Sequence, residues 1–146
     1  MCVCMTAREE HWRRLERLYL SAPTNAYYRP SIRIGDATAE IAVDVRTEFH
    51  HAANAVHGSV YFKLLDDAGF FAVNSIVDDV LVLTADFSIH LFRPVSEGTL
   101  IAKGKIVNAG KRMFVAEAEL FDSDGQLVAH GVGSYVRSRI PLPPPT

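Results

Sequence analysis

The chain has 146 residues, of which 49% are hydrophobic and 22% charged, and its formal net charge at pH 7 is −2. This length and balance predict a single globular domain with a sizeable core. The slight negative charge argues against binding to nucleic acid. No apolar run reaches the roughly 18 residues that a membrane-spanning helix needs, so we expect neither nucleic acid nor a membrane as a partner.

The N-terminal stretch MCVCMTAREEHWRR lacks the basic start and apolar segment of a secretory signal. Its two cysteines, Cys2 and Cys4, are too close together to staple a fold, and the chain has no second cysteine pair to complete a zinc site. These features predict a leader without a chemical role on a protein of the reducing cytoplasm.

The first part of the chain is predicted to contain one helix and one strand. Residues 6–20 repeat apolar side chains with helical spacing, and Trp12 and Leu15 lie on the same stripe. Pro23 closes this helix, and TNAYYRP is predicted to be a connecting loop. The stretch TAEIAVDVR alternates apolar and polar residues, which is typical of a half-buried strand. The polar, His-rich TEFHHAANAVHG is then expected to be a loop.

From Gly58 to about Ile76 the chain is apolar on nearly every face, which predicts a helix in the middle of the fold. Two adjacent carboxylates in such a helix require an explanation, because burying a charge among apolar groups is costly. The residues that break the apolar pattern are Lys63, Asp66, Asp67 and Asn74.

Four strand-like runs follow: VLVLTADFSIHLFRP, TLIAKGKIVN, MFVAEAELFD and LVAHGVGSYVRSR. The Asp-Gly of SDGQ favours a tight hairpin between the last two, because these residues accept a positive φ. The closing PLPPPT is predicted to be an extended tail that cannot pair with a strand. Strict alternation in the first run would place Leu81, Leu83, Ala85, Phe87, Ile89 and Leu91 on one face and Thr84, Asp86, Ser88 and His90 on the other.

This order of elements predicts a two-layer α+β domain with one apolar helix against an antiparallel sheet. We divide the chain into an N-terminal leader and helix (1–22), a single domain (23–139) and a Pro-rich tail (140–146). The outer face of the sheet is far from fully polar, so we expect another subunit to cover part of it.

Asp66 is the candidate for chemistry in the buried helix. Gly58 begins that helix, so its N–H is a first-turn donor without an intrahelical acceptor and suits a developing oxyanion. Asp66 lies eight residues further on, a little over two turns, and therefore on nearly the same side. Lys63 stands one turn before Asp67 and offers it a partner. We therefore interpret Asp67 as structural, and Asp66 as a desolvated carboxylate with a raised pKa that acts as base or nucleophile.

The stretch HGSVYFKLLDDAGFFAVNS resembles the signature of the PaaI-like hotdog-fold acyl-CoA thioesterases. In that family a His-Gly-Gly entrance to the central helix is followed by an Asp or Glu nine residues after the His, which here gives His57, Gly58 and Asp66. The resemblance covers residues from about Glu40 to Arg137, and it includes LTADFSIHLFRPV and GKRMFVAEAELFDSDGQLVAHG.

The resemblance implies a hotdog fold, in which an antiparallel sheet wraps around the long helix and two sheets join in a dimer. It places the active site at the dimer interface, and dimers often pair again into tetramers. In such an enzyme the Gly58 N–H would polarise the thioester carbonyl. Asp66 from the other subunit would attack the carbonyl carbon or activate water. No cofactor is implied.

Other residues receive roles from the same resemblance. Thr84 stands where relatives hold a hydroxyl near the attacking water, although strand propensity alone would also explain it. Ser59 replaces the second Gly of the motif and remains a candidate for substrate binding. A polar Asn that positions water in relatives is matched by His51 or by Asn54, and we favour Asn54. We expect His57 to brace the helix entrance through hydrogen bonds to the backbone.

Basic side chains at the rim of the sheet could pair with the phosphates of coenzyme A, or could simply be solvated turn charges. These are Lys111 and Arg112 at a hairpin and Arg137 and Arg139 on the last strand. His50, His51 and His57 cluster in sequence, but no acidic or Cys ligand stands at a helical spacing from them, so no metal site is predicted.

The main hypothesis is therefore an acyl- or aryl-CoA thioesterase that acts as a homodimer or homotetramer. A hotdog hydratase or dehydratase that uses His57 with a carboxylate, and a non-catalytic acyl-CoA-binding protein, remain alternatives. Phe62, Phe70 and Phe71 are compatible with a pocket for an aryl or medium-chain acyl group, or with plain core packing.

Overall fold

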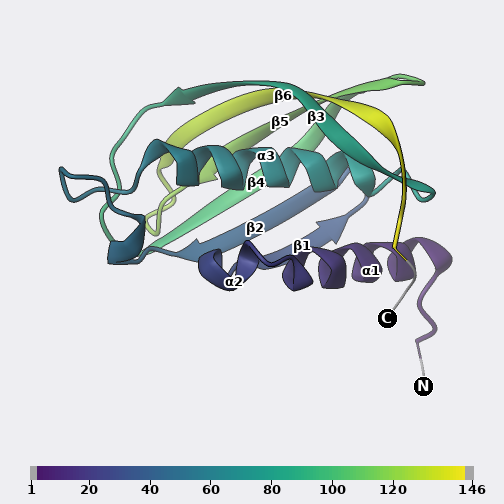
Figure 1. Cartoon of the computed structure of the whole chain (residues 1–146), viewed down its shortest axis with the longest axis horizontal. Helices are drawn as coiled ribbons and strands as arrows, with labels where there is room; N and C mark the ends of the chain where they lie inside the picture. The colour runs from purple at the N-terminus through teal and green to yellow at the C-terminus, as the bar shows by residue number, and fades with distance from the viewer. Residues whose placement is uncertain (1–2, 144–146) are drawn as a thin grey trace.

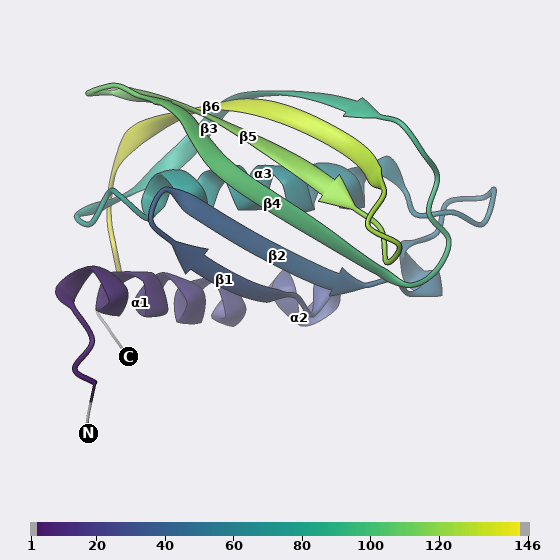
Figure 2. The same ribbon diagram turned by 180° about the vertical axis from the view of Figure 1, so that it is seen from behind.

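The computed structural model describes residues 3–143 and contains one antiparallel sheet around a long helix. The strands follow the order β1-β2-β4-β5-β6-β3 across the sheet. Figure 1 shows the sheet curving around α3, and Figure 2 shows from behind that β2, β4 and β5 cover this helix. The helices are α1 (Ala7–Ser21), α2 (Asn25–Tyr28) and α3 (Gly58–Asn74), and the strands are β1 (Ser31–Gly35), β2 (Thr38–Asp44), β3 (Val80–Leu91), β4 (Thr99–Ala109), β5 (Met113–Phe121) and β6 (Leu127–Pro141).

The central helix is buried because its apolar residues occupy nearly every face. Leu64, Leu65 and Ala68 have no exposed surface. A Cβ atom on Gly104 of β4 would lie 2.4 Å from the backbone oxygen of Ala68, so only glycine lets the sheet approach α3 this closely. The predicted α+β class, with one sheet wrapped around one long helix and an additional N-terminal helix, is confirmed.

Two short elements, besides a single 3-10 turn at Thr47–Phe49, were not expected from the sequence. The stretch predicted as a loop after Pro23 contains the single-turn helix α2, which Arg29 closes in the left-handed conformation at a φ of 52°. β1 is also new: it is a five-residue edge strand paired with β2. Such a short run between Pro30 and Gly35 carries a weak periodic signal. Its strand conformation is stabilised by hydrogen bonding to β2 rather than by the preference of its own residues.

The predicted alternation along β3 is wrong at one point. Thr84 pairs with Tyr135 of β6 but Asp86 pairs with Ser134, so Ala85 is an extra residue that forms a bulge. The bulge reverses which side chains face α3, because side chains alternate strictly along a regular strand. Val82 and Thr84 therefore face the helix, whereas Leu83 is 46% exposed. Thr84 does not share a face with Asp86, nor Leu83 with Phe87.

The C-terminal tail pairs further than expected. β6 extends to Pro141, which lies opposite Val80, and the Leu142 N–H donates to the Asp79 carbonyl at 3.2 Å. The prediction that PLPPPT cannot pair is therefore wrong for its first residues, and its last three lie outside the described part of the chain. Cys2 also lies outside it, and Cys4 is an exposed free thiol.

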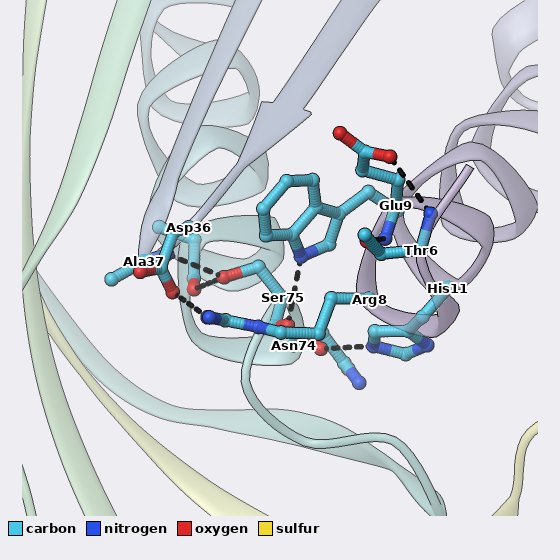
Figure 3. A network of polar contacts seen from close by, with 10 residues as sticks. Thr6, Arg8, Glu9, His11, Asp36, Ala37, Asn74 and Ser75 are labelled. Carbon is cyan, nitrogen blue, oxygen red and sulfur yellow. Dashed lines mark hydrogen bonds and ion pairs between the residues drawn. The ribbon is translucent and has the colours of Figure 1, made fainter. Parts of the chain in front are cut away.

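Helix α1 is hydrogen-bonded to the C-terminal end of α3, as Figure 3 shows. His11 Nε2 lies 2.8 Å from the Asn74 carbonyl oxygen, and the Trp12 indole N–H donates to the Ser75 carbonyl at 3.1 Å. Thr6 and Glu9 form a capping box at its start. Leu15, on the same helix, is fully buried in the main core, so α1 packs as part of the domain.

Candidate active site

Asp66 is held by two hydroxyl groups from neighbouring strands. Thr84 of β3 donates from Oγ1 to Oδ1 of Asp66 at 2.9 Å. The Tyr135 hydroxyl of β6 lies 3.1 Å from the same Oδ1 and 3.1 Å from the Asp66 backbone oxygen. Tyr135 has no exposed surface, so its hydroxyl reaches Asp66 from inside the core.

The surroundings of Asp66 change its proton affinity in the predicted direction. Burial raises the pKa of Asp66, and hydrogen bonds from Thr84 and Tyr135 lower it without cancelling that effect. Burial, followed by the charge of Asp66, also raises the pKa of Tyr135, so the phenol stays protonated and acts as a donor. Asp66 is therefore a carboxylate with a raised pKa that accepts two hydroxyl donors on one oxygen.

Asp67 has different partners on another side of α3. Lys63 Nζ lies 2.7 Å from its Oδ2, which confirms the predicted local ion pair. The Tyr19 hydroxyl of α1 donates to the same oxygen at 2.7 Å. Burial, followed by the charge of Asp67, raises the pKa of Tyr19. Asp67 thus links α3 to the N-terminal helix.

The entrance to α3 is capped by His57. Its Nδ1 accepts the Ser59 N–H at 3.0 Å and lies 2.8 Å from Ser59 Oγ, while the His57 N–H donates to the Phe49 carbonyl at 2.9 Å. His57 therefore orders the helix entrance through backbone contacts. Gly58 is the first helical residue, and a Cβ atom there would lie 3.1 Å from Leu91 Cδ1. Its N–H has no acceptor within the helix, as is true of every first-turn amide.

Asn54 and His51 close a tight turn just before this entrance. The Asn54 N–H donates to the His51 carbonyl at 3.0 Å, and the His51 N–H donates to the Ala55 carbonyl at 2.9 Å. Asn54 adopts a φ of 62°, a left-handed conformation that Asn tolerates better than most residues. Both side chains are exposed. The turn alone therefore accounts for an Asn here.

The predicted phosphate-binding residues lie at one rim of the sheet. Lys111 and Arg112 are exposed on the β4–β5 hairpin, and the Arg137 N–H donates to the Arg112 carbonyl at 3.2 Å. The Arg137 side chain forms an ion pair with Asp79 at 2.6 Å. Arg137 thus has a carboxylate partner, whereas no such ion pair involves Lys111 or Arg112 among residues 3–143.

The three phenylalanines of α3 have separate environments. Phe71 is core and packs edge-on against Tyr19 with ring centres 5.0 Å apart. Phe70 is half-buried beside Tyr135. Phe62 is 41% exposed and packs against Phe87 with ring centres 5.4 Å apart. Phe71 is therefore no candidate for an acyl pocket. Phe62 is the one of the three whose ring is exposed enough to contact a substrate.

One subunit cannot bring Gly58 and Asp66 to a single carbonyl group. Eight residues of helix span about 12 Å, several times the reach of a hydrogen bond. β3, which carries Thr84, is an edge strand whose only neighbour in the sheet of the described chain is β6. Apolar residues are exposed near this edge: Phe62, Leu91 and Phe92.

A hollow of about 730 Å³ lies elsewhere, lined by residues of α1 and of strands β1, β2, β4 and β5. Its lining includes Trp12, Arg33 and Lys103, and none of the predicted site residues contributes to it. In the part of the chain that the structure describes, no three His, Cys, Asp or Glu side chains are grouped to hold a metal ion. No helix there has both the length and the apolar character to span a membrane.

Tyr135 was missed by sequence reasoning. SYVRS offers no motif, and the pairing of Tyr135 with Thr84 depends on the register between β3 and β6. The bulge at Ala85 determines that register, and a one-residue irregularity leaves no clear signal in an alternating sequence.

Comparison with known proteins identifies relatives of the whole domain. The family described as the thioesterase superfamily matches residues 53–129, more than half of the chain. A putative esterase from Archaeoglobus fulgidus is 31% identical over 114 residues, which cover 77% of this chain and 73% of that protein. A solved structure described as from the thioesterase superfamily is 27% identical with a TM-score of 0.81, over 88% of this chain and 99% of its own.

The E. coli PaaI protein from the phenylacetic acid degradation operon shares the fold. Its structure has a TM-score of 0.84 against this chain at 20% identity, and the match covers 93% of this chain and 99% of that chain. The resemblance to PaaI-like hotdog proteins that was drawn from the sequence is confirmed.

Proposed function

The chain belongs to the thioesterase superfamily and is a thioester hydrolase of the hotdog fold, and from this premise we propose that its substrate is an acyl- or aryl-CoA thioester. Asp66 is the proposed base or nucleophile. The observation that carries the proposal is the state of this residue: burial raises its pKa, and two hydroxyl donors orient it on a rigid helix.

The proposed active unit is a homodimer in which each site draws on both subunits. Gly58 and Asp66 lie about 12 Å apart on one helix, so a two-fold axis is the simplest way to bring them together. That symmetry sets Asp66 of one subunit beside the partner's Gly58, and it creates two equivalent sites. The exposed edge of β3 and the apolar surface at Phe62 support this contact. Dimers can pair further into tetramers.

The proposed reaction is hydrolysis: water cleaves the bond between the acyl carbon and sulfur, which gives a carboxylic acid and free coenzyme A. As a base, Asp66 would take a proton from water, the hydroxide would add to the carbonyl carbon, and the departing thiolate would take up the proton. As a nucleophile, Asp66 would add to the carbon itself and expel the coenzyme A thiolate, which would take a proton from solvent. Water would then hydrolyse the resulting anhydride, releasing the free acid and regenerating the Asp66 carboxylate. Both routes place negative charge on the carbonyl oxygen, which the partner's Gly58 N–H would stabilise.

The remaining residues receive supporting roles in the proposal. Asn54 would position water at the mouth of the site, and Ser59 would contact substrate in the first turn of α3. Lys111 and Arg112 would pair with coenzyme A phosphates, while Arg137 would assist from its pair with Asp79. The location of this activity would be the cytoplasm, where acyl-CoA thioesters are formed.

The test of activity is release of free thiol from a panel of acyl- and aryl-CoA substrates. We expect the wild-type chain to hydrolyse at least one class, and Asp66→Asn to reduce the rate by about 10³-fold or more. Binding of acyl-CoA without thiol release would identify a non-catalytic binder. Hydration of an enoyl-CoA without hydrolysis would favour the hydratase.

Mixing of two inactive variants tests the shared site. Gly58→Pro removes the N–H donor at a helix position where proline is tolerated, and His57 already has the extended conformation that precedes proline. Gly58→Ala keeps the donor and is the matched control. If sites are shared, a dimer of one Gly58→Pro and one Asp66→Asn subunit holds one intact site and one doubly altered site. Random mixing of equal amounts makes about half of the dimers mixed, so about a quarter of all sites should be restored. No recovery would contradict the shared arrangement.

A further inference from the structure

We propose that Tyr135 is a positioning residue which, together with Thr84, holds Oδ1 of Asp66 and leaves Oδ2 as the oxygen that reacts. This inference deepens the proposed function and rests on it. It applies whether Asp66 takes a proton from water or attacks the carbonyl carbon, because both steps require one oxygen with a free lone pair.

The positions of the two donors carry the inference. Thr84 and Tyr135 are directly paired across β3 and β6, and both hydroxyls reach Oδ1, at 2.9 and 3.1 Å. Within residues 3–143, no donor contacts Oδ2 of Asp66. A carboxylate oxygen offers about two lone-pair directions, so these hydroxyls occupy Oδ1 and leave Oδ2 open.

The packing around the phenol fixes its hydroxyl in place. A Cβ atom on Gly69 would lie 2.5 Å from the Tyr135 hydroxyl oxygen, and one on Gly133 would lie 2.8 Å from it. The two glycines therefore provide the space for this group in a tightly packed core. Tyr135 also shares its hydroxyl with the Asp66 backbone oxygen, so it aligns the side chain and the helix together.

The two hydroxyls also affect the pH range in which Asp66 is ionised and Oδ2 can therefore react. Hydrogen bonds to a carboxylate favour its ionised form and oppose the effect of burial. The charged groups acting on Asp66 are Lys63 and Asp67 of α3, which oppose each other, while β3 and β6 contribute the two hydroxyls. Loss of one hydroxyl should therefore raise the pKa of Asp66 further and shift activity to higher pH.

The experiment compares Tyr135→Phe with Tyr61→Phe. Each variant removes one tyrosine hydroxyl and keeps the ring, but the Tyr61 hydroxyl donates to the Arg93 carbonyl at 3.0 Å and does not contact Asp66. The readouts are the Asp66 carboxyl titration followed by ¹³C NMR and the acidic limb of kcat/KM. We expect Tyr135→Phe to move both upward by about one pH unit and to lower kcat several-fold with little change in KM. Tyr61→Phe should move neither.

A second pair protects the test if Tyr135→Phe folds poorly. Thr84→Val removes the other hydroxyl at nearly constant volume, and Thr84→Ser retains it. We expect the valine variant to reproduce the upward shift and the serine variant to restore the wild-type pH profile. An Asp66 titration unchanged by both Tyr135→Phe and Thr84→Val would overturn the inference. The NMR titration does not depend on hydrolysis, so an inactive wild-type protein with shifted variants would refute only the proposed function.

Discussion

Asp66 and Asp67 are adjacent in sequence and have the same side chain, but their surroundings differ in kind. Asp66 faces the sheet, where two neutral hydroxyls contact one oxygen, and no cation among residues 3–143 lies within hydrogen-bond distance of it. Asp67 faces α1, where Lys63 and Tyr19 converge on one oxygen. An uncompensated buried carboxylate is available for chemistry, whereas a paired one stabilises structure. The two carboxylates therefore differ in their partners and not in residue type, and on this difference we propose different roles for them.

Catalysis should change most, and it separates Asp66 from Asp67 directly. Asp66→Asn keeps the shape of the side chain but removes the reacting charge, so we expect thioester hydrolysis to fall by about 10³- to 10⁴-fold. Asp67→Asn should retain activity within about five-fold, because its side chain does not face the site. Steady-state thiol release measures both. Equal losses in the two variants would abolish the distinction.

The next effect concerns stability and runs in the opposite order. Asp67→Asn leaves Lys63 without its carboxylate in a partly buried position, where the two side chains are 15% and 21% exposed. We expect a loss of about 1–3 kcal/mol in the free energy of unfolding. Urea denaturation provides the measurement. A loss below about 0.5 kcal/mol would show that the pair behaves like an ordinary surface ion pair.

A smaller effect tests how Asp67 is linked to the N-terminal helix. Tyr19→Phe removes the hydroxyl that reaches Asp67 across from α1 but retains the aromatic packing on Phe71. We expect a loss of about 1 kcal/mol, with catalysis unchanged. In a double-mutant cycle with Asp67→Asn the two losses should be less than additive. Additive losses would mean that this hydrogen bond contributes nothing to stability.

The smallest effect is a stability gain from a change at Asp66, the proposed reacting residue. The pKa of Asp66 is raised in the folded state, so protonation of Asp66 favours folding. This contribution to the free energy of unfolding is complete below the pKa of the unfolded state and is lost as the pH rises through the pKa of the folded state. Asp66→Asn, which is always neutral, should therefore melt at a higher temperature than wild type near pH 7. The difference should vanish on acidification below the ordinary pKa of Asp. Scanning calorimetry at several pH values provides the measurement. A wild-type protein that melts at a higher temperature than Asp66→Asn near pH 7 would contradict the expectation.

The sequence predicted the elements with strong local periodicity. Helix α3 and its candidate carboxylate stood out because apolar residues surround Asp66 in the sequence, and Lys63 stands one helical turn from Asp67. The N-terminal helix was recognised for the same reason. In each case the informative residues lie within a few positions of one another.

The parts that were not predicted depend on contacts between distant segments. β1 is held by its neighbour β2, and Tyr135 reaches Asp66 only because β6 lies beside β3. Likewise, nothing near Tyr19 in the chain indicates that it meets Asp67, 48 residues later. Such pairs are set by sheet register and by helix docking, which local patterns do not encode.

The bulge at Ala85 has a consequence for how this enzyme can diverge. Because Ala85 is the extra residue between two intact pairs, a descendant that lost it would still hold Thr84 opposite Tyr135 and Asp86 opposite Ser134. Its deletion would restore unbroken alternation along β3 and leave Thr84 facing the carboxylate. The gene can therefore lose one codon at this point of the strand without changing the neighbours of Asp66.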